Sequence, residues 1–161
     1  MLMTSWRSLS PAQEAALLKR AGELHIGRKR RDQPEHRVQS AAFAAIRAAE
    51  ATYPVLQLIY AVPNGGKRGK LTAVQMWREG ARAGMPDINV DVPRWGYHGL
   101  RIEVKIGTYP SPEQILVHQH LEAQGYCVVV IKGKEAQAYN ELLGVVAEYL
   151  GLPPFWRPYE Y

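Results

Sequence analysis

Seven residues near the middle of the chain alternate apolar and charged side chains and read Leu100-Arg101-Ile102-Glu103-Val104-Lys105-Ile106. Successive side chains of a β-strand point to opposite faces, so the four apolar residues predict one buried face. Arg101, Glu103 and Lys105 then share the other face. On an edge strand this would be an ordinary solvated face, with Glu103 and Lys105 as an ion pair. In the middle of a mixed sheet, the same face would become a site.

The patterns on either side of this strand predict an α/β fold in the order α-α-β-α-β-β-α-β-α. Helices are expected over residues 10–24, 34–51, 71–80, 112–124 and 134–150, and strands over residues 55–62, 88–92, 99–106 and 126–132. The connection 93–98 is short enough for an antiparallel hairpin. We therefore expect a mixed β-sheet with helices on its faces.

The composition fits one domain with anionic partners. The chain has 161 residues, a formal charge of +5 and 47% hydrophobic residues, enough for one core. The single cysteine, Cys127, excludes an internal disulfide and a Cys-rich zinc site. The apolar run 127–131 is far shorter than the roughly 18 residues of a membrane span, so we expect a soluble, intracellular protein.

The positive charge lies in two segments of the chain. Residues 1–34 and 64–82 each carry a net charge of +4, whereas the chain from residue 107 onward carries −3. Basic segments favour nucleic acid as a partner. The run 28–31 is equally typical of a solvated linker.

Asp87 stands where a glycine-proline turn, Gly84-Met85-Pro86, enters the strand 88–92. An aspartate that bonds its own turn backbone is the simpler interpretation. The hairpin, however, would bring Asp87 beside Glu103 on the returning strand. Two neighbouring carboxylates repel each other unless a cation joins them, and such oxygen ligands suit Mg²⁺ or Mn²⁺ rather than zinc.

Glu35 and Gln114, which lie on two predicted helices, are placed to complete such a site. Glu35 and Gln39 are four residues apart and therefore share one face of their helix. Glu35 also lies three residues after Asp32, which is the spacing of a capping box. Gln114 has the same alternative, because it lies three residues after Ser111.

The loop after the first predicted strand is suited to bind phosphate, because glycines let the backbone approach an anion and cations follow them. It is not a Walker A loop, since Leu71 stands where Ser or Thr is needed. Residues 66–69 match the GXXG of KH RNA-binding domains, but the strand predicted before them does not fit that fold. The candidate DNA-binding residues are Asn64, Gly65, Gly66, Lys67, Arg68, Lys70 and Arg82.

Pro86-Asp87 followed by Glu103-Val104-Lys105 resembles the PD-(D/E)xK nuclease superfamily. Three further motifs stand around these two in the expected order: Glu35-His36-x-x-Gln39 on an upstream helix, Pro63-Asn64-Gly65-Gly66 after the first predicted strand, and Ser111-Pro112-x-Gln114 at the start of the helix after Glu-x-Lys. Together they resemble the virus-type replication-repair nuclease (VRR-NUC) domain over about residues 35–131. The resemblance implies a restriction-endonuclease-like sheet in a domain spanning 35–150, with a basic extension at 1–34 and a Pro/aromatic tail at 151–161.

The resemblance also implies roles for individual residues. Asp87, Glu103 and the backbone carbonyl of Val104 would hold Mg²⁺ or Mn²⁺, and Glu35 would reach the metal or its water shell. Lys105 would orient or help to deprotonate the attacking water, and Gln114 would join the catalytic set. The metal would lower the pKa of its bound water and neutralise charge on the phosphate.

For stand-alone domains, the resemblance implies a homodimer that cuts branched DNA such as Holliday junctions, in the cytoplasm of bacteria or as a phage product. Cutting a four-way junction symmetrically needs two sites, which a C2 dimer supplies. Trp95 and the aromatic tail are the candidate interface. The alternatives are a flap, exonuclease or restriction-type nuclease, and a non-catalytic nucleic-acid-binding module. A non-catalytic module is disfavoured because the motif residues Asp87, Glu103 and Lys105 are all present.

Overall fold

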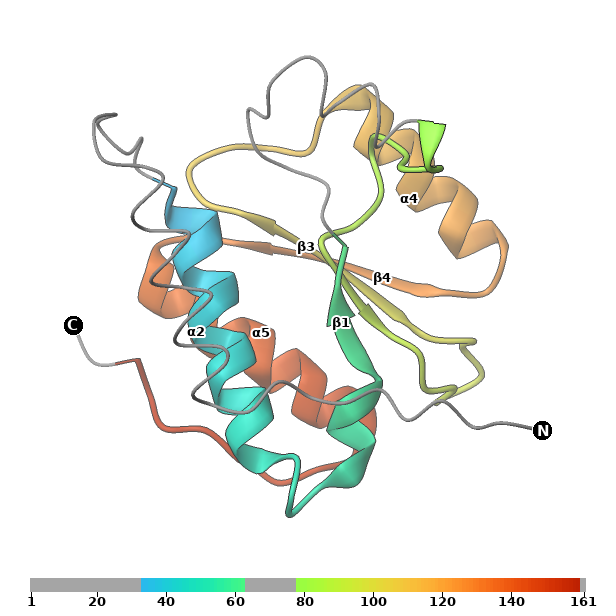
Figure 1. Cartoon of the computed structure of the whole chain (residues 1–161). Coiled ribbons are helices and arrows are strands. Elements are labelled where there is room, and N and C mark those ends of the chain that lie inside the picture. Colours follow the sequence, from blue (N-terminus) through green and yellow to red (C-terminus); the bar gives the residue numbers. More distant parts are fainter. Residues whose placement is uncertain (1–32, 63–77, 160–161) are drawn as a thin grey trace. The chain divides into compact units, whose positions relative to one another are not determined.

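The computed structural model describes residues 33–62 and 78–159 (Figure 1). Their elements, in chain order, are α2 (Pro34–Ala49), the 3-10 helix η1 (Pro54–Leu58), β1 (Ile59–Ala61), β2 (Ile88–Val90), β3 (Leu100–Lys105), α4 (Pro112–Ala123), β4 (Cys127–Lys132) and α5 (Glu135–Leu150). The strands form one sheet in the order β1-β2-β3-β4, in which only β3 and β4 are parallel. The predicted α/β fold with a mixed sheet is confirmed.

The sheet lies between two layers of helices. Helices α2 and α5 pack on each other and against β3, whereas α4 lies on the opposite face of the sheet (Figure 1). Leu100, Ile102 and Val104 are completely or almost completely buried in the core with residues of α2 and α5. The polar face of β3 is covered as well, because Gln114 and His118 of α4 lie against Glu103.

Two predicted strands differ from the observed ones. Of residues 55–62 only Ile59–Ala61 pair, because Pro54 opens a 3-10 helix, where its fixed φ and missing N–H are tolerated. The apolar run within 126–132 predicts a buried strand, but β4 is an edge of the four-stranded sheet and only Ile131 in it is fully buried. Edge strands lack a neighbour on one side, which leaves their side chains half exposed.

Several predictions lie outside the described residues, namely the helix over 10–24, the loop 63–70 and all but the end of the helix over 71–80. The same holds for Asp32; the N-cap of α2 is Gln33, whose side chain makes no capping hydrogen bond. Among the described helices, none is long and apolar enough to cross a membrane.

The aromatic tail packs on its own domain. The ring centroid of Phe155 lies 6.4 Å from that of Tyr53 and 5.4 Å from that of Trp156. Tyr159 stacks in a tilted arrangement on Tyr139 of α5, at 5.1 Å. The four aromatic residues of the tail predict that it packs either on its own domain or on a partner subunit, and these contacts place it against its own core.

Phe155→Ala is expected to lower the free energy of unfolding by about 1–2 kcal/mol, because a half-buried ring and two aromatic contacts are lost. Urea unfolding followed by circular dichroism measures it. Tyr109→Ala is the control, since Tyr109 is 80% exposed. Equal losses in the two variants would contradict a stabilising role of the tail.

Candidate active site

The β2–β3 hairpin brings the two predicted carboxylates together. Ile88 lies opposite Ile102 in the antiparallel register, and the next pair in that register is Asp87 and Glu103. Asp87 Oδ2 accepts a hydrogen bond of 2.9 Å from the backbone N–H of Val104. This bond holds the Asp87 carboxylate against β3, level with the Glu-x-Lys motif.

Glu103 is the centre of the site and is completely buried. Its Oε1 accepts hydrogen bonds from Lys105 Nζ, at 2.7 Å, and from Gln114 Nε2. Its Oε2 has no hydrogen-bond partner within the described residues. A buried carboxylate oxygen without a partner is costly, so this atom is placed to receive a cation.

The charges of the site depend on one another. Burial raises the pKa of Glu103 to about 6; the bond from Lys105 opposes this rise, and the charge of Asp87 adds to it. Burial likewise raises the pKa of Asp87. Burial alone would lower the pKa of Lys105, but the hydrogen bond and charge of Glu103 outweigh it and raise this pKa. Lys105 therefore stays protonated, while the buried Glu103 and the half-buried Asp87 carry charge that one lysine only partly offsets.

Gln114 forms the capping box of α4 and also contacts Glu103. Its backbone N–H donates to Ser111 Oγ at 3.3 Å, and its Oε1 accepts from the backbone N–H of Ser111 at 2.9 Å. These two bonds form the capping box of α4. Because the box fixes the amide oxygen, the amide nitrogen of the same side chain faces Glu103 and donates to it.

Gln114→Ala is expected to lower the free energy of unfolding by about 1 kcal/mol, because half of the capping box and a hydrogen bond to a buried carboxylate are lost. Urea unfolding measures this change. Gln119→Ala, at an exposed position of the same helix, is the matched control. A Gln114→Ala protein as stable as the control would show that the capping box contributes nothing.

His118 also lines the site, although no motif of the sequence points to it. It is 7% exposed, and its Nε2 lies 3.8 Å from Glu103 Oε2. Neither atom has a hydrogen-bond partner among residues 33–62 and 78–159. His118 and His120 are two residues apart and so lie on different faces of α4, which argues against a histidine metal pair. His118 lies four residues after Gln114 and therefore on the same face of α4, and this spacing is the sequence signal that could have placed His118 in the site.

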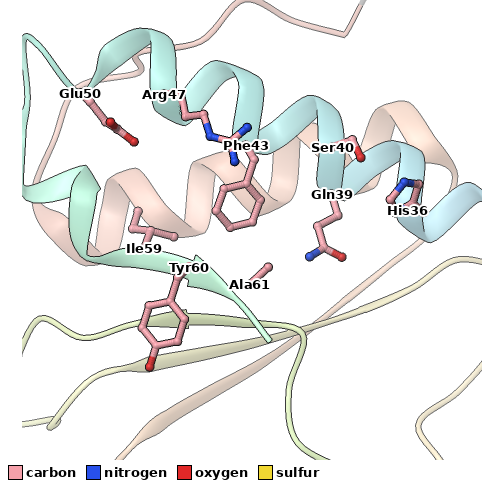
Figure 2. Close-up of a pocket in the computed structure, with 9 residues that line it drawn as sticks. All are labelled: His36, Gln39, Ser40, Phe43, Arg47, Glu50, Ile59, Tyr60 and Ala61. Carbon is pink, nitrogen blue, oxygen red and sulfur yellow. The ribbon is translucent and has the colours of Figure 1, made fainter. Parts of the chain in front are cut away.

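Glu35 reaches the end of β3 from α2. Its Oε1 accepts hydrogen bonds of 3.2 Å from the backbone N–H of Ile106 and from Thr108 Oγ1. Glu35 thus fixes the start of the loop between β3 and α4. Gln39, which shares the motif with Glu35, lines a groove between α2 and β1 together with His36 and other residues (Figure 2).

The predicted DNA-binding residues are described only in part. Arg82 is exposed in the segment before β2, and the remaining six, which lie in residues 64–70, are outside the described residues. The pocket beside Lys105, formed by the ends of β3 and β4, was not predicted from the sequence.

The donor set of the site fits a hard divalent cation. Among the described residues, no three His, Cys, Asp or Glu side chains form a ready-made metal site. Mg²⁺, however, is commonly bound by one or two carboxylates, with water and substrate filling the other positions. Asp87 and Glu103 supply two carboxylates, and the buried, unpartnered Oε2 of Glu103 is the atom that a cation would satisfy.

Comparison with known proteins agrees with this geometry. No family model matches the chain, and no curated protein matches it. A solved structure titled "VRR_NUC domain protein" is 28% identical, with a TM-score of 0.57, over 79% of this chain and 96% of that one. Another, titled "VRR_NUC domain", is 23% identical with a TM-score of 0.44, over 73% of this chain and 99% of that one. The first likeness, together with the motifs and the mixed sheet, supports a VRR-NUC domain in this chain.

Proposed function

We propose that this protein is a metal-dependent DNA endonuclease that hydrolyses phosphodiester bonds with Mg²⁺ or Mn²⁺. The observation that carries the proposal is the buried Glu103 carboxylate. One of its oxygens is held by Lys105 and Gln114, and the other accepts no hydrogen bond from the described residues, with His118 Nε2 3.8 Å away. This is the arrangement expected of a carboxylate that shares a cation with Asp87 and the phosphate of a substrate.

Each residue of the site has a distinct part in the proposed reaction. Asp87, Glu103 and the backbone carbonyl of Val104 would hold the metal, which supplies an activated water and offsets charge on the phosphate. Lys105 is protonated and on the same strand face as Glu103, so it would orient the attacking water and steady the phosphate. Gln114 positions the Glu103 carboxylate, and Glu35, whose charge acts on Asp87 and Lys105, would take part through the water shell.

We further propose that the substrate is branched DNA and that the active form is a homodimer in the cytoplasm. The nuclease domain would span 35–150, with the basic extension 1–34 and the tail 151–161 flanking it. The loop 64–70 and the exposed Arg82 would contact phosphates. Trp95 is 75% exposed and is the remaining candidate for the dimer interface.

The test of the nuclease proposal is cleavage of labelled linear, flap, splayed and four-way-junction DNA with Mg²⁺, Mn²⁺ or EDTA. We expect cleavage with either metal, none with EDTA, and a preference for the branched substrates. Metal-supplemented protein that cuts none of these DNAs would remove the enzymatic function and leave the alternative of a binding module.

The dimer is tested separately by sedimentation velocity at the protein concentration of the cleavage assay. We expect a mass near twice that of the chain, reduced towards the monomer by Trp95→Ala. A monomeric parent would remove the junction-resolving form of the proposal while leaving the hydrolytic site unaffected.

A further inference from the structure

A hollow of about 580 Å³ lies beside the candidate active site, at the ends of β3 and β4. Lys105 stands at its border and belongs to both sites. The other residues that matter to its chemistry come from the loop after β3, from the end of β4 and from the start of α5, and they are Thr108, Tyr109, Lys132, Lys134 and Gln137.

The hollow has an excess of positive charge. Lys105 and Lys132 are register partners on parallel neighbouring strands, so their side chains leave the same face. Like charges at such a position destabilise a sheet unless they are compensated. The carboxylate of Glu103 neutralises the charge of Lys105, with Oε1 and Nζ 2.7 Å apart. Within the described part of the chain, neither Lys132 nor Lys134 forms an ion pair. The described lining contains no acidic residue, which predicts an anionic ligand.

The hollow also presents an exposed aromatic ring. Tyr109 is 80% exposed, and Lys132 Nζ lies 4.8 Å from its ring centroid. Lys132 covers one face of the ring, so the other face is available to a flat ligand. Glu35 holds the loop that carries Tyr109 through Ile106 and Thr108. A positioned aromatic ring beside cations is typical of surfaces that bind single-stranded nucleic acid.

We propose that this hollow is a subsite for one unpaired nucleotide adjacent to the phosphate that is cut, an inference that rests on the proposed function. The base stacks on the open face of Tyr109, and its phosphate lies between Lys132 and Lys134. A base inside a continuous duplex is already stacked and cannot offer its face to Tyr109. The subsite therefore favours DNA with an unpaired nucleotide, as found at forks and flaps, over continuous duplex.

The test is the affinity of the full chain for two labelled DNAs in EDTA, where no cutting occurs. One DNA has splayed single-stranded arms, and the other is a fully paired duplex of equal length. Tyr109→Ala is expected to weaken binding of the splayed DNA about tenfold, the usual effect of losing one stacked base, and to change duplex binding less than about twofold. Tyr109→Phe keeps the ring and should bind both DNAs as the parent does. Tyr97→Ala, at another exposed tyrosine, is the matched control and should also bind as the parent does.

Lys132→Gln tests the phosphate contact. It should weaken binding of the splayed DNA and reduce the dependence of log affinity on log salt by about 0.7–1, the contribution of one phosphate contact. Arg94→Gln, at an exposed position on the β2–β3 connection, should leave the binding of the splayed DNA and its salt dependence unchanged.

The results separate this subsite from the nuclease proposal. Equal binding by Tyr109→Ala and the parent, or equal losses on both DNAs, would overturn the subsite even if the protein cuts DNA. Losses in Tyr109→Phe as large as in Tyr109→Ala would overturn stacking as its basis. A selective loss in Tyr109→Ala together with no cleavage in any metal would keep the subsite and remove the nuclease.

Discussion

Glu103→Gln is expected to lower the rate of DNA cleavage by about 10³-fold, as for loss of a central electrostatic group in an active site. Glutamine has almost the same volume as glutamate, and its amide oxygen can still accept hydrogen bonds from Lys105 and Gln114. It carries no negative charge, however, and cannot bind a divalent cation with Asp87. Single-turnover cleavage of the preferred DNA with Mn²⁺ measures the effect.

The matched control is Glu141→Gln, which makes the same chemical change at an exposed position of α5. It should cleave DNA at the parent rate. Purifying parent, control and Glu103→Gln by one procedure also tests for a contaminating nuclease, which would be equally present in all three. Cleavage by Glu103→Gln at the parent rate would show that the hydrolytic site is elsewhere.

The centre of the fold could be predicted because its signals are local. The alternation over residues 100–106 identifies a strand, and the short connection before it makes an antiparallel hairpin the simplest topology. Those two signals favour a position of Asp87 beside Glu103, and the observed register of β2 and β3 sets the two opposite each other. Side-chain alternation likewise sets Lys105 on the face of Glu103.

The features that could not be predicted depend on contacts between distant segments. Lys132 lies beside Lys105 only because α4 carries the chain over to a parallel β4, and a parallel register leaves no local signature. The exposure of β4 follows from its place at the edge of the sheet rather than from its apolar composition. His118 enters the site because the whole of α4 is anchored by its capping box over β3, which orients the face that Gln114 and His118 share.

The stability of the metal-free protein is expected to fall as the pH rises from about 4.5 to 6. The pKa of Glu103 is raised from 4.5 to about 6 in the folded protein, chiefly by burial. Between these values the unfolded chain releases the proton of Glu103 while the folded protein keeps it, so unfolding becomes easier. The whole shift corresponds to a loss on the order of 2 kcal/mol, and the raised pKa of Asp87 acts in the same direction. Urea unfolding in EDTA between pH 4 and 7, on the parent and on Glu103→Gln, isolates the contribution of Glu103.

Above pH 6 a divalent cation should reverse this loss, because it binds the ionised carboxylates of the folded protein and not the unfolded chain. At a hundredfold excess of Mn²⁺ over its dissociation constant, the added stability is about 2.7 kcal/mol. Glu103→Gln removes both effects, so in EDTA at pH 7 it should be more stable than the parent and gain little from Mn²⁺. If the free energies of unfolding of the two proteins changed in parallel with pH, the ionised Glu103 carboxylate would not destabilise the metal-free protein. Equal stabilisation of both by Mn²⁺ would mean that the cation binds elsewhere. A Glu103 carboxylate that destabilises the metal-free protein, and a cation that removes this destabilisation, would together connect the geometry of Glu103 to hydrolysis.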